Sequence, residues 1–126
     1  MKYINTKNAP KAVGPYSQAI VSGGFIFCAG QIGIDPKTSE LAEGIEAQTD
    51  QVMKNLKAVL TAGNSNLDHV VKTTVYLSNI VDYVKMNEVY GKYFADHKPA
   101  RAAFAVADLP RGALIEIEVV AEISKS

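Results

Sequence analysis

Two charged residues in the C-terminal third, Arg101 and Glu116, have the types needed to hydrolyse a small acid. Arg101 follows Pro99, stands beside small alanines, and is one of two arginines in the chain. A guanidinium binds a carboxylate through two parallel hydrogen bonds, so Arg101 is a candidate for acid recognition. Glu116 lies in the next apolar run, where a glutamate can position or deprotonate a water. Two arginines also fit a ligand with one carboxylate better than a multiply charged ligand.

Each of these residues also has a purely structural interpretation. Glu116 alternates with Ile115 and Ile117, which is the pattern of any strand with one face on the core and the other in water. The long side chain of Arg101 can reach solvent from the start of a strand. The residue types alone therefore leave the two interpretations open.

The elements that carry this pair are two predicted strands, residues 99–104 and 113–120, on either side of a Pro-Gly turn. We expect them to form a hairpin. A hairpin that closes symmetrically about its turn pairs Arg101 with Val119, on the opposite face from Glu116. A shift of register by one residue, or a bulge, puts both side chains on one face. Whether Arg101 and Glu116 share one face therefore depends on the register of the two strands.

The rest of the chain predicts further strands and two helices. A short edge strand over residues 2–5 and a strand over 16–21 precede a buried strand over 25–29. Gly30 directly follows, and its bare backbone either admits a ligand or simply ends the strand. Apolar residues with a 3.6-residue period predict a helix over 45–62. A β-branched strand over residues 70–77 and a second helix ending near residue 96 come next, and Asn87 lies off the apolar stripe of that helix.

This element order predicts an α+β fold with a mixed β-sheet and two helices packed on one face. The other face of the sheet then needs a partner, because one side of the last strand mixes aliphatic and acidic residues. These residues are Leu114, Glu116, Glu118, Val120 and Glu122. We take this mixture as an indication of oligomerisation.

Length and composition indicate one domain spanning residues 1–126, with 48% hydrophobic and 21% charged residues. No apolar run reaches the ~18 residues of a membrane span, and the N-terminus lacks a signal-like apolar segment, so we expect a cytoplasmic protein without a membrane partner. The formal charge of +0 argues against a nucleic-acid partner. Cys28 lies in an apolar run that predicts burial, and the isolated His69 and His97 predict no metal site.

Four motifs lie in order along essentially the whole chain. They are Gly14-Pro15-Tyr16-Ser17-Gln18-Ala19, Ala29-Gly30-Gln31-Ile32, Met86-Asn87-Glu88-Val89-Tyr90, and Pro99-Ala100-Arg101 with Leu109-Pro110 and Ile115-Glu116-Ile117. Together they resemble the Rid family of reactive intermediate deaminases, the RidA-type or YjgF-like proteins. The resemblance implies a chorismate-mutase-like α+β fold and a homotrimer with sites in the clefts between subunits.

The resemblance also implies an activity, namely hydrolysis of enamines and imines such as 2-aminoacrylate to a 2-keto acid and ammonia. This is the reaction of a 2-iminobutanoate/2-iminopropanoate deaminase, and it uses neither a cofactor nor a metal. By position, Arg101 would bind the substrate carboxylate and Glu116 would orient the attacking water. Tyr16 would line the cleft, the backbone of Gly30 would contact the imino or keto acid, and Asn87 would add a polar edge.

The sequence differs from archetypal family members at two positions, and two other functions are considered beside the deaminase. Ala29 and Ala103 stand where many archetypal members carry a serine and a cysteine, which can alter pocket size and substrate preference. One alternative is a non-catalytic regulatory module that binds a small carboxylate or keto acid in the same cleft. The other is a ribonuclease or translation inhibitor, against which the zero charge and the lack of a basic cluster argue.

Overall fold

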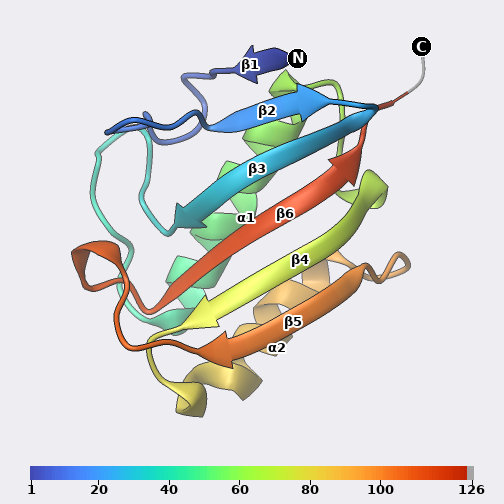
Figure 1. Cartoon of the computed structure of the whole chain (residues 1–126). Helices are drawn as coiled ribbons and strands as arrows, with labels where there is room; N and C mark the ends of the chain where they lie inside the picture. The colour runs from blue at the N-terminus through green and yellow to red at the C-terminus, as the bar shows by residue number, and fades with distance from the viewer. Residues whose placement is uncertain (125–126) are drawn as a thin grey trace.

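The computed structural model describes residues 1–124, which form one mixed six-stranded sheet and two α-helices (Figure 1). The α-helices and strands in chain order are β1 (Lys2–Ile4), β2 (Ala19–Ser22), β3 (Phe25–Ile32), α1 (Ile45–Ala62), β4 (Val70–Leu77), α2 (Tyr83–Tyr93), β5 (Ala100–Ala105) and β6 (Ile115–Glu122). The strand order is β1-β2-β3-β6-β4-β5, and β4 and β5 are parallel while the other pairs are antiparallel. The predicted α+β class is confirmed.

Both helices pack on the same face of the sheet, and the opposite face is uncovered (Figure 1). Alternate residues of β6 point to the helices and are buried, namely Ile115, Ile117, Val119 and Ala121. The predicted apolar stripe of α1 meets them, and its members Val52, Met53, Leu56, Val59 and Leu60 are 0% exposed. Each such side chain stabilises the fold by about 1.5–3 kcal/mol relative to leaving it in water. No helix within residues 1–124 has both the length and the apolar character to cross a bilayer.

The predicted hairpin of the last two strands is wrong, because β4 lies between β5 and β6. The chain passes from β4 through α2 into β5, and such a crossover returns the chain parallel to the strand it left. β6 then pairs with the other edge of β4. The connection between β5 and β6 spans the end of β4, where Val106 N donates to Leu77 O at 2.8 Å and Ser78 N donates to Leu114 O at 3.0 Å.

β3 does not end before Gly30 as predicted but continues to Ile32. Its register against β6 shifts between Cys28 and Gln31, which places a bulge at Ala29 and Gly30. β2 begins later than predicted, at Ala19, so Tyr16 belongs to the preceding loop. Cys28 is buried as predicted, and burial raises the pKa of its thiol to about 12.

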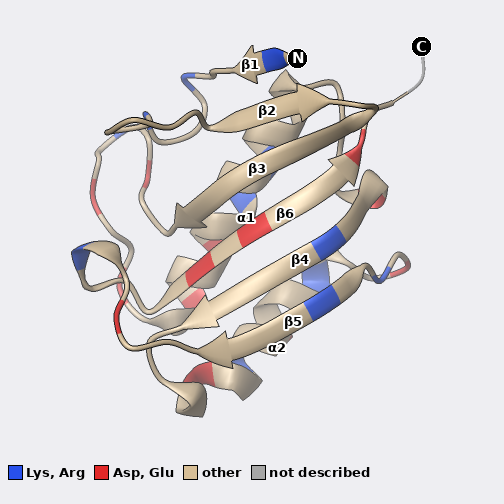
Figure 2. Cartoon of the chain, in the orientation of Figure 1, with Lys and Arg blue, Asp and Glu red and all other residues tan. Residues whose placement is uncertain are grey.

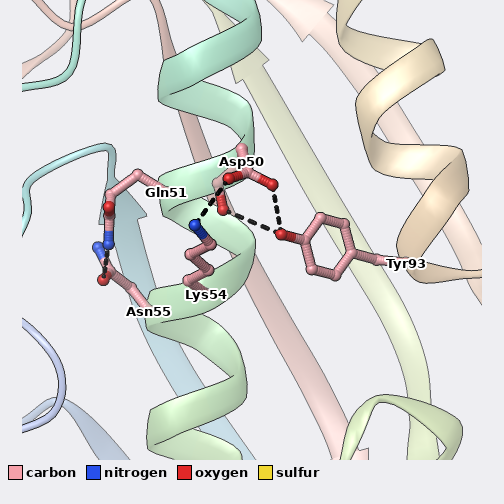
Figure 3. Close-up of polar contacts among 5 residues, drawn as sticks. All are labelled: Asp50, Gln51, Lys54, Asn55 and Tyr93. Carbon is pink, nitrogen blue, oxygen red and sulfur yellow. Dashed lines mark hydrogen bonds and ion pairs between the residues drawn. The ribbon is translucent and has the colours of Figure 1, made fainter.

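Polar contacts of α1 hold the neighbouring elements in place (Figure 3). The hydroxyl of Tyr93, at the end of α2, donates to the carboxylate of Asp50 in α1, and Lys54 forms an ion pair with the same carboxylate at 3.0 Å. The hydrogen bond from Tyr93 lowers the pKa of Asp50, with Lys54 contributing less. Along the same helix, Asn55 accepts from Gln51 and donates to main-chain carbonyls at and just after the end of β3. The end of α2 and the end of β3 are thus both fixed to α1.

Candidate functional site

Glu116 lines a cavity of about 390 Å³ together with Gly30 and Tyr16. Glu116 comes from β6, Gly30 from the bulge in β3, and Tyr16 from the loop before β2. The volume lies within the ~300–1,000 Å³ of typical ligand pockets. Three of the five residues predicted for the site therefore meet at one cavity.

Gly30 leaves the space that the Glu116 carboxylate occupies. A β-carbon built on Gly30 would lie 2.8 Å from Cδ of Glu116 and closer still to its Oε2. Any other residue at this position would push the carboxylate away. The bulge in β3 thus brings bare backbone against the acid, as bulges beside active sites often do.

The Glu116 carboxylate is half-buried, and burial raises its pKa above that of an ordinary glutamate. The neighbouring carboxylate of Glu118, on the same face of β6, raises this pKa further. Glu118 is held by Tyr76, whose hydroxyl donates to Oε1 of Glu118 at 2.6 Å. A carboxylate with a raised pKa is better suited to accept a proton near neutral pH.

Gln18 holds the loop that carries Tyr16. This buried side chain accepts a hydrogen bond from Thr6 N at 2.7 Å, and its amide donates to the carbonyls of Thr6 at 3.1 Å and Pro10 at 2.8 Å. Gln18 belongs to the first sequence motif, but its role as a positioning residue depends on contacts with Thr6 and Pro10, which that motif does not include.

Arg101 lies on the opposite face of the sheet from Glu116. Arg101 is paired with Thr73 on β4, and Thr73 with Val119 on β6, so these three share the face that the helices cover. Glu116 is paired with Tyr76 and shares the uncovered face. Acidic stretches on β6 and basic stretches on β4 and β5 can be followed in Figure 2. Within one chain, the structure does not bring Arg101 and Glu116 together.

Three residues of α2 hold the Arg101 side chain. Its Nη1 donates to Oδ1 of Asn87 at 2.7 Å, and its Nη2 donates to the hydroxyl of Tyr83 at 2.8 Å. The guanidinium carbon lies 4.9 Å from the centre of the Tyr90 ring, a cation–π contact. Asn87 thus contacts Arg101 directly, and a guanidinium has five N–H donors, so others remain for a ligand.

Arg101 and Asn87 line a second cavity, of about 260 Å³, at the side of the sheet covered by α2. Tyr83 was not identified from the sequence as a site residue, and Tyr90 was named within a motif without being given a role in the site. A signal was present, because Tyr83, Asn87 and Tyr90 follow one another at the i, i+4 and i+7 spacing of one helix face. No cluster of three or more metal-ligating side chains occurs among residues 1–124.

Comparisons with known proteins agree over nearly the whole chain. A protein-family model described as endoribonuclease L-PSP matches residues 6–123. A RutC family protein from Pyrococcus horikoshii is 56% identical over 119 residues, which are 94% of each chain. The human 2-iminobutanoate/2-iminopropanoate deaminase is 46% identical over 121 residues, 95% of this chain and 88% of the human one. The crystal structure of Escherichia coli TdcF with bound serine has a TM-score of 0.94 at 35% identity and covers 98% of this chain and 100% of its own.

Proposed function

Because the chain belongs to the Rid family, the family of the endoribonuclease L-PSP model, we propose that it hydrolyses reactive enamines and imines to 2-keto acids and ammonia. The substrates would be 2-aminoacrylate and related 2-imino acids. The observation that carries the proposal is the half-buried Glu116 carboxylate, with its raised pKa, at the wall of a ligand-sized cavity. The human relative, a 2-iminobutanoate/2-iminopropanoate deaminase, supports the same reaction.

In the proposed mechanism, Arg101 binds the substrate carboxylate and Glu116 holds a water against the imine carbon. An enamine first tautomerises to the imine. Glu116 accepts a proton as the water adds and returns it to the nitrogen, so that the tetrahedral adduct forms its C=O bond and expels ammonia. One water is consumed and one ammonia is released, so the balance needs no cofactor. Imines already hydrolyse in water, and holding both reactants in place supplies much of the acceleration.

We further propose that the complete site forms between subunits of a homotrimer. A cyclic assembly joins one surface of a subunit to a different surface of the next, which would bring Arg101 of one chain to Glu116 of its neighbour. Exposed apolar side chains lie on the uncovered face of the sheet and in the turn before α2. Phe27 (47% exposed) and Phe104 (45%) lie on the uncovered face of the sheet, and Val81 (75%) lies just before α2. Such surfaces mark protein interfaces.

A panel of imines generated in place by an amino-acid oxidase tests the proposed activity. We expect the protein to accelerate ammonia release from small neutral 2-imino acids, because a held water and an anchored carboxylate both favour addition. The rate of ammonia release is compared with and without the protein for each imine. Equal rates across the whole panel would contradict the proposal.

A module that binds a small carboxylate without turning it over is the alternative, and the serine bound to TdcF supports it. A Glu116→Gln protein separates the two functions. If it still binds a 2-keto acid but loses imine turnover, the proposal is supported, whereas unchanged turnover excludes the role given to Glu116. We do not assign the ribonuclease activity in the description of the family, because the formal charge of +0 offers little attraction to a phosphate backbone.

The pH dependence of turnover is expected to respond to Glu118. Glu116 must be ionised to accept a proton, so activity falls as the pH drops through its pKa, and the raised pKa places this fall at higher pH than for an ordinary glutamate. Glu118→Gln removes the neighbouring charge and keeps an acceptor for Tyr76. The acid limb of kcat/KM against pH should therefore move to lower pH. Burial still keeps the pKa of Glu116 above that of an ordinary glutamate, so the limb should remain above the position expected for an ordinary glutamate.

Glu122→Gln is the matched control for this profile. Glu122 lies on the same face of β6, further from Glu116, and does not contribute to the raised pKa. The acid limb should stay in place in this variant. An equal displacement in the Glu118 and Glu122 variants would mean that the limb does not report the contact between Glu116 and Glu118.

A further inference from the structure

A cavity of about 620 Å³ adjoins the Glu116 cavity. The two share lining residues from the N-terminal loop, the loop after β3 and the turn before β6. These residues are Pro10, Lys11, Val13, Ile34 and Arg111. The combined space is much larger than the smallest imino acids require. The site therefore has room for a longer substrate side chain, directed from Glu116 toward the outer cavity.

The outer cavity is lined by three cations, Lys7, Lys11 and Arg111, and by no acid among residues 1–124. None of the three takes part in an ion pair within this part of the chain. In the inner cavity, Glu116 is the one acidic residue of the described lining. This concentration of unneutralised positive charge contrasts with the formal charge of +0 for the whole chain. An anion in the outer cavity is attracted by these cations and does not have to displace a protein carboxylate from them.

The turn before β6 aims the Arg111 side chain at this space. Arg111 has φ 57° and ψ 23°, in the left-handed region that residues other than glycine rarely adopt. Its guanidinium donates to the carbonyl of Ser39 at 3.3 and 3.4 Å, and Ser39 is itself left-handed with φ 61°. Two unfavourable backbone conformations thus meet at the border of the cavities. Such strain persists where the surrounding structure holds a side chain in a required position.

We propose that Lys11 and Arg111 form an anion subsite for a second, distal carboxylate, so that the protein accepts imines of acidic amino acids. This inference rests on the proposed function and names a substrate class for it. In the proposed trimer, Arg101 of the neighbouring subunit would bind the α-carboxylate, and the distal carboxylate would extend along the cavity to the two cations. The expectation of a ligand with a single carboxylate rested on the count of arginines. The structure adds two lysines to that count and places the second arginine on the cavity wall.

The test is the ratio of kcat/KM for the imine of glutamate to that for the imine of 2-aminobutyrate. We expect this ratio to fall about fivefold or more in Lys11→Gln and in Arg111→Gln, and to fall with added KCl in the wild type, because both side chains are exposed and salt screens exposed charges. Lys57→Gln removes a cation of α1 that lines neither cavity, and it should keep the wild-type ratio. An unchanged ratio in both cavity variants overturns the proposal.

Arg111→Gly guards against a folding defect, because it removes the same charge while relieving the left-handed strain. Its ratio should fall as in Arg111→Gln, and a wild-type ratio in this variant counts against the subsite.

Calorimetric binding of 2-oxoglutarate and 2-oxobutyrate separates this proposal from the proposed function. If no imine is turned over but 2-oxoglutarate binds more tightly and loses that preference in Arg111→Gln, the subsite stands and the deaminase fails. If imines are turned over but neither Lys11 nor Arg111 affects the preference for 2-oxoglutarate, the deaminase stands and the subsite fails.

Discussion

Two variants that are inactive alone, Arg101→Ala and Glu116→Gln, are expected to regain imine turnover when they are assembled together. Alone, each should lose about 10²-fold or more, because one lacks the anchor for the substrate carboxylate and the other lacks the general base. In the proposed trimer, each site takes Arg101 from one chain and Glu116 from the next. Random assembly of equal amounts then leaves about a quarter of the sites with both groups intact.

The expectation depends on the strand order of a single chain. β4 separates the strands of Arg101 and Glu116, and the paired residues place the first side chain on the helix side and the second on the uncovered side. Rotating a side chain cannot move it through a sheet, so a site that contains both groups requires a second chain. If turnover depended on Arg101 or on Glu116 but not on both, the site would not require a second chain.

The measurement is the initial rate of ammonia release after the two chains are unfolded together and refolded as one mixture. The control mixes wild type with a chain that carries both substitutions. Sites between chains predict about a quarter of the wild-type rate for both mixtures. Sites within one chain predict no recovery for the first mixture and about half for the control. Native mass spectrometry verifies that mixed trimers have formed, and failure to recover activity in them would contradict the proposed site.

The face of Glu116 was predictable from the sequence because strand alternation is local. Ile115 and Ile117 are buried, and the acid between them must face the other way. The relation of Glu116 to Arg101 was not predictable in this way. It depends on β4, which lies between the two strands because β5 returns parallel to β4 after α2 while β6 pairs with the other edge of β4.

The same distinction holds for the helices. The bounds of α1 were predicted as observed, because eighteen residues give a clear 3.6-residue period. α2 ends at Tyr93, earlier than predicted, because Phe94 leaves the helical conformation. Phe94 nevertheless stays buried, so the apolar pattern of the sequence continues past the end of the helix. The contacts of Tyr83 with Arg101, and of Arg111 with the cavities, arise between segments that the sequence does not place side by side.

Gly30→Ala is expected to lower imine turnover by about tenfold or more while the fold is retained. The added β-carbon would overlap the Glu116 carboxylate, with Cδ at 2.8 Å. The overlapping atoms are the end of a flexible side chain, so the carboxylate moves and the backbone stays. Displacing a catalytic group by about 1 Å is enough to cost up to ~10²-fold in rate. The readouts are kcat/KM for a small neutral imine and the melting temperature.

Gly33→Ala is the contrasting substitution. A β-carbon there would lie 2.8 Å from Cα and 2.9 Å from the carbonyl oxygen of Gln48 in α1. Backbone atoms of a helix cannot move aside as a carboxylate can, so this variant should lose melting temperature, whereas Gly30→Ala should keep most of it. The pair of glycines thus separates a position that serves the acid from one that serves the packing of α1.

A double-mutant cycle tests whether Gly30→Ala acts through the Glu116 carboxylate. If Gly30→Ala acts by displacing the Glu116 carboxylate, it should have little further effect on the residual turnover of Glu116→Gln, because the group it displaces no longer acts as a base. Independent effects would multiply instead. A multiplied loss in the double variant, or a fall in melting temperature as large as that of Gly33→Ala, would mean that Gly30 is required by the bulge itself. In that case the carboxylate would owe its position to other contacts in the cavity.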